Sequence, residues 1–167
     1  ESVDGFDPSV IAAEDDEFCI RLRCAGWKLL RVPVEMTLHD ADMHAFGQWW
    51  RRAVRAGHAY AQVEAMHPGH FAQARRRVLA WGAGVPAILA GLAVVSTGAA
   101  LAAAGSLYGL SFAKTFRSVR AEGQSRRDAG IYAAFLTISK FPEFVGLVKY
   151  HLRRLRHEPM RIIEYKL

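Results

Sequence analysis

The sequence predicts an α-rich protein in which a small α/β part is followed by an amphipathic helix and a membrane-spanning helical hairpin. In residues 14–34 an acidic run opens a short helical pattern that leads into a strand-like run. Residues 45–66 repeat apolar side chains at spacings of three and four. Residues 78–113 contain no charged side chain. We therefore expect four segments: 1–44, 45–75, 76–120 and 121–167.

The first element is expected at residues 15–25, directly after the acidic run Glu14-Asp15-Asp16-Glu17. Helical spacing places Phe18, Leu22 and Ala25 on one face. Gly26 fits a C-terminal stop, because glycine readily adopts the left-handed conformation that ends many helices. Residues 27–34 then predict a strand that ends near a proline.

The acidic run has two interpretations. Acids in the first turn of a helix are stabilised by the positive end of the helix dipole. Alternatively, like charges a few Å apart raise one another's pKa, and a carboxylate with a raised pKa suits general-base catalysis.

Several short motifs, in their order along residues 1–60, resemble the acceptor-side half of family-two glycosyltransferases. These motifs are Asp4-Gly5-Phe6-Asp7, Glu14-Asp15-Asp16-Glu17-Phe18-Cys19-Ile20-Arg21-Leu22, Ala25-Gly26-Trp27, Val32-Pro33 and Leu38-His39. The resemblance implies a GT-A α/β fold. It also implies transfer of a sugar, with inversion, from a nucleotide-sugar donor to a hydroxyl of a glycan or lipid-linked acceptor at a membrane.

The same resemblance implies candidate site residues. Asp15 matches the family's usual catalytic base and Glu14 matches its partner, which leaves Asp16 and Glu17 as helix-start acids. His39 matches a histidine that completes the shell around Mg²⁺ or Mn²⁺ in some GT-A enzymes, although a lone loop histidine is more often structural.

The donor half of such an enzyme is not recognisable in the sequence. Asp40-Ala41-Asp42 resembles an Asp-x-Asp metal motif but follows the Glu-Asp pair instead of preceding it, so we interpret it as a polar loop. We expect a nucleotide-binding half with the main metal motif upstream of Glu1, and no activity in the isolated chain.

Residues 45–66 predict an amphipathic helix with two different faces. The apolar face contains Phe46, Trp49, Trp50, Ala53, Val54, Gly57, Tyr60 and Ala61. The polar face contains Gln48, Arg51, Arg52, Arg55 and Gln62. Gln48 and Arg51 lie one turn apart, so both can reach one ligand, and guanidinium groups suit phosphate oxygens.

Processive members of the resembled family carry a Gln-x-x-Arg-Trp motif on such a helix. Here Gln48 and Arg51 keep the pattern, but Arg52 replaces the tryptophan, which leaves processivity open. By resemblance, Gln48, Trp49, Arg51 and Arg52 are candidates for binding the diphosphate or the acceptor. The alternative is an interfacial helix whose tryptophans lie at lipid headgroup depth, which we favour for Trp49 and Trp50.

The uncharged run 78–113 is about 54 Å long as one helix, whereas a hydrocarbon core is about 30 Å thick. A break at Ser96-Thr97-Gly98 therefore predicts a hairpin of helices 78–95 and 99–117. A hairpin buried in a soluble protein is the competing interpretation. Arginines 75–77 precede the run and Lys114, Arg117 and Arg120 follow it, so both ends are basic as expected for the cytoplasmic side. We expect residues 1–75 in the cytoplasm, at the cytoplasmic (inner) membrane.

The remaining sequence adds a bent helix and a basic tail. Residues 131–150 are apolar but interrupted by charges and Pro142, which favours a helix lying at the interface. Residues 151–157 are basic and suit anionic lipids, or form a solvated end. The 22 basic residues against 16 acids, with no nucleic-acid-binding motif, indicate membrane phosphates instead of nucleic acid. Cys19 and Cys24 form neither a metal pair nor a disulfide framework.

A second function remains open from the sequence. The absent donor half and the apolar and basic stretches between residues 75 and 157 would also suit a non-catalytic membrane anchor or assembly module. Such a module would bind anionic lipid or a partner subunit.

Overall fold

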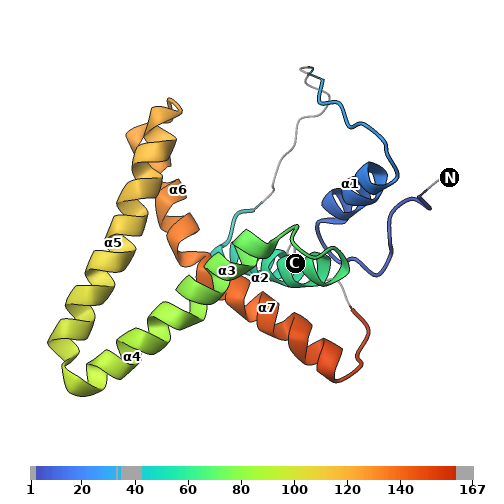
Figure 1. Cartoon of the computed structure of the whole chain (residues 1–167). Coiled ribbons are helices and arrows are strands. Elements are labelled where there is room, and N and C mark those ends of the chain that lie inside the picture. Colours follow the sequence, from blue (N-terminus) through green and yellow to red (C-terminus); the bar gives the residue numbers. More distant parts are fainter. Residues whose placement is uncertain (1–2, 33, 35–42, 161–167) are drawn as a thin grey trace. The chain divides into compact units, whose positions relative to one another are not determined.

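The computed structural model describes residues 3–32, 34 and 43–160, and every regular element within them is helical (Figure 1). The elements in chain order are α1 (Glu14–Cys24), α2 (Phe46–Met66), α3 (Ala72–Leu79), the π-helical segment η1 (Ala80–Gly84), α4 (Val85–Val95), α5 (Thr97–Ala121), α6 (Arg126–Ile138) and α7 (Lys140–Leu155). The chain divides into a first unit, Glu1–Arg75 with Val145–Leu167, and a second unit, Arg76–Phe144.

The predicted α/β part is wrong, because the described residues contain no strand. Residues 27–32 and 34, where the sequence predicted a strand, have no regular structure, and Leu30 is 87% exposed. A strand needs a neighbouring strand to pair its N–H and C=O groups, and the described residues offer none. A GT-A α/β domain is therefore not the fold of this chain.

The helix predicted at 15–25 is confirmed as α1, and so is its stop. Gly26 adopts φ 86°, its N–H donates to the Arg23 carbonyl at 3.0 Å, and the Trp27 N–H donates to the Leu22 carbonyl at 3.0 Å. This is a Schellman arrangement, in which a left-handed residue lets the chain satisfy the last carbonyls of the helix.

The helix predicted at 45–66 is confirmed as α2, but its buried face differs from the prediction. Ala53, Val54, Gly57 and Ala61 are buried as expected. His58 and Gln62 are buried as well, although the pattern placed Gln62 on the polar face. The buried face is therefore wider than the apolar residues alone indicate.

In the second unit, the predicted break near residue 96 is confirmed. Helix α4 ends at Val95, and the Ser96 hydroxyl accepts from the Ala99 N–H at 3.2 Å, which caps α5. Helix α5 packs against α4 and α6 (Figure 1). The Tyr108 hydroxyl donates to the Trp81 carbonyl at 3.1 Å, with the two rings 5.6 Å apart, which ties α5 to η1.

Two helical stretches are long and apolar enough to cross a membrane, judged by length and composition: Ala72–Val95 and Arg126–Leu155. The first contains the predicted helix 78–95. The second contains residues 131–150, for which the sequence favoured a helix lying at the interface. The predicted spanning helix 99–117 is not among the two stretches, because Gly, Ser and Tyr residues dilute the apolar content of α5. Large apolar side chains of α4 and α5 point outward in the second unit, and Val94 is 88% exposed. Such a surface is typical of contact with lipid.

Candidate functional site

The acidic first turn of α1 begins at an unusual residue. Ala13, the N-cap, adopts φ 57° and has no side chain that can bond the exposed N–H groups. The acids therefore lie beside the positive end of the helix dipole. Asp15 and Asp16 are exposed and Glu14 is half-buried, and none of these three carboxylates bonds another residue in the described part of the chain. The Asp15 carboxylate is thus open to a ligand.

Glu17 differs from the other acids of the turn, because it is only 1% exposed. Its two carboxylate oxygens accept from Arg21 Nε at 2.8 and 3.0 Å. His67 Nε2 lies 2.9 Å from Oε1, and it donates this bond because a carboxylate can only accept. The hydrogen bond from Arg21, and then that from His67, lower the pKa of Glu17 below its ordinary value. The sequence pattern predicted only a helix-start acid at residue 17, whereas Glu17 joins α1 to the end of α2.

Arg21 extends this connection to the N-terminal segment. Its guanidinium donates to the Val3 carbonyl, and to the Gly5 carbonyl at 2.5 Å. It also lies over the Phe18 ring at 5.4 Å. The i,i+4 spacing of Glu17 and Arg21 is a sequence signal for their pairing. No local pattern indicates His67, 50 residues further along the chain.

Gln62 makes a second tie between α2 and the N-terminal segment. Its side-chain amide donates to the Ser9 carbonyl at 2.6 Å, and its side-chain oxygen lies 3.5 Å from the Ile11 nitrogen. These bonds explain why a glutamine is buried on α2, since a buried amide needs polar partners. Together, the Glu17 and Gln62 contacts hold the start of α1 beside the C-terminal half of α2.

The residues proposed to bind a diphosphate lie at the other end of α2. Gln48 Oε1 accepts from the His44 N–H at 2.8 Å and the Ala45 N–H at 3.0 Å, so it closes the N-terminus of the helix. Gln48 precedes His67 by 19 residues, or about 28 Å along the axis. Arg51 follows within a turn. The structure therefore does not bring Gln48 and Arg51 within reach of Asp15.

The first turns of α2 instead form an aromatic cluster. Phe46 lies 5.2 Å from Trp49 and 6.0 Å from Trp50, measured between ring centroids, and Phe46 is exposed. Arg52 on the same helix is exposed. Trp49 and Trp50 are half-buried. Aromatic side chains at a helix surface beside a cation are typical of contact with lipid headgroups.

His58 is a buried titratable residue that no motif or spacing in the sequence indicates. It is fully buried on α2, its ring lies edge-on to Tyr150 at 5.3 Å, and neither ring nitrogen has a hydrogen-bond partner in the structure. Burial, followed by the positive charge of Arg153, lowers the pKa of His58 to about 4. The imidazole is therefore neutral at pH 7.

The expected metal ligands lie mostly outside the described residues. His39 and the polar loop at residues 40–42 fall there. Among the residues that the structure does describe, no group of three His, Cys, Asp or Glu side chains is arranged to hold a metal ion, and Cys19 and Cys24 are free thiols. No step involving Mg²⁺ or Mn²⁺ is therefore assigned to these residues.

No protein-family model, no curated protein and no solved structure matches the chain.

Proposed function

We propose that the chain is the membrane-associated, acceptor-side part of an inverting glycosyltransferase, with Asp15 as its general base. The proposal depends chiefly on Asp15, whose carboxylate is exposed and unbonded in a motif order that resembles this enzyme family. Glu17, two residues further along, accepts hydrogen bonds at both carboxylate oxygens and therefore cannot act as the general base. Two stretches with the length and composition of membrane spans support the membrane association.

In this mechanism Asp15 accepts the proton of an acceptor hydroxyl as the hydroxyl oxygen attacks the anomeric carbon. The bond from that carbon to the diphosphate oxygen breaks, and the nucleoside diphosphate leaves with the bonding electrons. Glu14 orients the base or the acceptor. The donor binds to a part of the enzyme outside this chain. Gln48 and Arg51 lie at the start of α2, whereas Asp15 lies near His67, at the end of α2, because His67 bonds Glu17. We therefore assign the start of α2, with Trp49 and Arg52, to the membrane surface.

Replacing Asp15 by Asn in the complete protein tests the role of the base. General-base catalysis contributes about 10²–10⁴-fold, so we expect the Asp15→Asn variant to lose sugar transfer by that factor while it binds the nucleotide sugar normally. Donor binding by calorimetry and transfer of a radiolabelled sugar measure the two effects.

Asp16→Asn is the matched control, because Asp16 is equally exposed in the same turn. It should retain transfer. Equal turnover in both variants would remove Asp15 from the mechanism. Hydrolysis of a nucleotide sugar by the isolated chain would contradict the assignment of the donor site to another part of the enzyme.

A non-catalytic membrane anchor or assembly module is the second candidate. It is favoured by the outward-facing apolar side chains of α4 and α5. If the complete protein binds no nucleotide sugar but still requires residues 76–144 to fractionate with membranes, this second function is the correct one.

A further inference from the structure

The second unit contains a groove of about 910 Å³ between η1, α5 and α6. This volume is within the usual range for sites that bind small molecules. Every residue that lines it lies between Arg77 and Lys140, so the groove is formed within the second unit alone. The glycosyltransferase proposal does not involve this groove.

Along α5 the side chains that line the groove differ in charge from one end to the other. Glu122 and Asp128 lie at the end near the α5–α6 turn, and the Asp128 carboxylate accepts from the Ser125 hydroxyl at 2.6 Å. Lys114 lies eight residues before Glu122 on α5, about 12 Å along the axis. Leu107 and Leu110 follow in the direction of the α4–α5 turn. The acids are therefore at one end, a cation is in the middle and apolar side chains are at the other end.

Two of the cations in the groove are unused within the protein. Arg77 and Lys114 are exposed, and neither bonds another residue among those the structure describes. Lys140 differs, because its ammonium donates to the buried Glu143 carboxylate at 2.7 Å. Arg77 and Lys114 therefore bring two positive charges to the groove that no described residue of the protein pairs.

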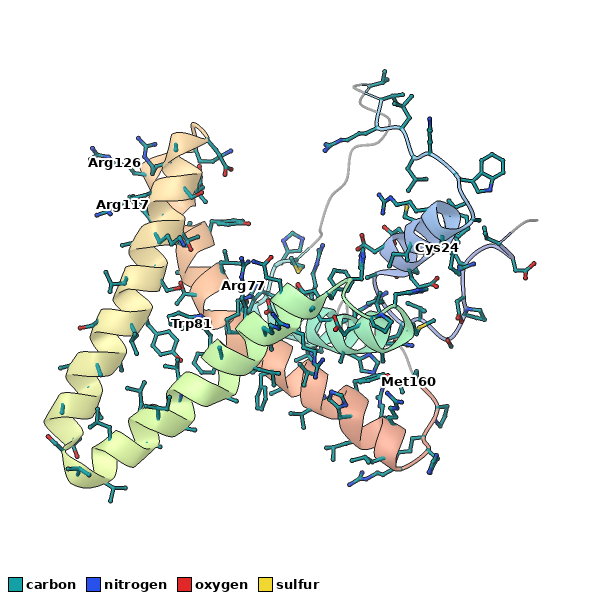
Figure 2. The ribbon with its side chains drawn as sticks, viewed as in Figure 1. Cys24, Arg77, Trp81, Arg117, Arg126 and Met160 are labelled. Carbon is teal, nitrogen blue, oxygen red and sulfur yellow. The ribbon has the colours of Figure 1, made fainter. Side chains whose placement is uncertain are left out.

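Trp81 lines the same groove next to Arg77 and adds an apolar surface to it. It lies one turn beyond Arg77 on the same helical stretch (Figure 2), and its ring packs against Tyr108. A molecule with an anionic head and an apolar tail fits this order of side chains. The head would bind the cations, and the tail would extend over Trp81, Leu107 and Leu110 toward the exposed apolar tip formed by Val94, Val95 and Leu101.

We propose that this groove binds a membrane lipid through its anionic phosphate, with Arg77 and Lys114 as the phosphate ligands and Trp81, Leu107 and Leu110 around the upper acyl chain. Arginine and lysine both form charge-assisted bonds to phosphate oxygens. The position of Arg77 agrees with a membrane span whose basic N-terminal end lies at headgroup depth, as in the stretch Ala72–Val95. The acids near the α5–α6 turn repel a phosphate and so restrict it to the middle of the groove.

The test uses the full chain in detergent micelles, with Trp27, Trp49 and Trp50 replaced by Phe so that Trp81 is the only tryptophan. Phosphatidic acid with brominated acyl chains quenches tryptophan fluorescence on contact. We expect brominated phosphatidic acid to quench Trp81 fluorescence until the effect saturates. Brominated phosphatidylcholine should produce no saturable quenching.

Arg77→Gln and Lys114→Gln should each raise the half-saturating lipid concentration about fivefold, which is the effect of removing one cation at a membrane surface. Arg117→Gln is the matched control. Arg117 is exposed on α5, three residues from Lys114, does not line the groove and points away from Arg77 and Trp81 in Figure 2. Arg117→Gln should leave the half-saturating lipid concentration unchanged. Circular dichroism checks that all variants keep their helices.

Several results would overturn the proposal. Equal effects of Arg117→Gln and Lys114→Gln would mean that general surface charge attracts the lipid. Competition by inorganic phosphate at the concentration that saturates the lipid would mean that the groove binds free phosphate. Concentration-dependent dimers that exclude the lipid would mean that a second copy of the chain occupies the groove.

Discussion

At the scale of single residues, neighbouring acids in one helical turn have different roles. Asp15 exposes its carboxylate, whereas the Glu17 carboxylate is buried and bonded to Arg21 and His67. The sequence shows four similar acids, and only the direction in which each side chain points separates them. Glu17 lies on the side of α1 that faces α2, and so it becomes a structural residue.

Replacing Glu17 by Gln should destabilise the first unit by about 1.5–3 kcal/mol, because charge-assisted bonds to Arg21 and His67 are lost in a buried place. Since the pKa of Glu17 is lowered in the folded chain, this stabilisation is present above the ordinary carboxyl pKa and is lost as the pH falls through the lowered value. Urea unfolding followed by circular dichroism measures the difference. Asp16→Asn, an exposed change in the same turn, should shift stability by less than about 0.5 kcal/mol. Equal stability of the two variants would contradict the role given to Glu17.

His58 should make the stability of the first unit depend on pH. Its pKa falls from 6.5 to about 4 on folding, so the unfolded chain binds a proton that the folded chain does not bind. Stability is therefore complete above pH 6.5 and declines as the pH falls toward 4, by on the order of 2 kcal/mol.

The variant His58→Leu should remove this decline, and at pH 7 it should cost little because neither ring nitrogen has a hydrogen bond to lose. Thermal unfolding between pH 4.5 and 7.5 gives the slopes. His70→Gln, at an exposed histidine, should keep the wild-type slope. If His58→Leu also keeps it, the pH dependence has another source.

At the scale of elements, a close crossing of α2 and α7 organises the first unit. A Cβ atom at Gly146 would lie 1.9 Å from the Val54 carbonyl oxygen and 2.7 Å from the His58 nitrogen. The two backbones approach this closely because glycine has no side chain there. In the second unit Gly82 has the same role, since a Cβ would lie 2.5 Å from the Lys140 carbonyl oxygen.

Gly146→Ala should separate α7 from α2 and destabilise the first unit by about 3 kcal/mol, the upper range for overpacking a core. Gly109→Ala, in the middle of α5 with open space around it, should instead stabilise the protein by about 0.5–1 kcal/mol through better helix propensity. Chemical denaturation of both variants measures their free energies of unfolding. A neutral Gly146→Ala would mean that the two helices can move apart without cost.

Local rules predicted most helices correctly. Gly26 ended α1, Ser96 separated α4 from α5, and the spacing of three and four located α2. The strand prediction failed because a strand depends on pairing partners, which a pattern of residues 27–34 cannot show. The contacts of Glu17 with His67, and of Gln62 with Ser9, join residues about 50 positions apart, and no periodicity encodes them.

At the scale of the whole molecule, the charge pattern follows the division into units. The N-terminal stretch of the first unit ends at Arg75, within the arginine run that the sequence predicted at a membrane surface. The second unit contains the uncharged run 78–113. Residues from Val145 onward also belong to the first unit. The proposed site at Asp15 lies in the first unit and the proposed lipid groove in the second. Each can therefore be tested without altering the other.

The buried Glu17 also affects which substitutions this protein can accept during evolution. Helix α1 is anchored from its fourth residue, so its position does not depend on which acids occupy residues 14 and 15. Substitutions there, Asp15→Asn included, should therefore cost little in folding. Changes at Glu17, Arg21 or His67 would have to arise together. We expect the three residues of this anchor to be inherited as a set, whichever acids occupy residues 14 and 15.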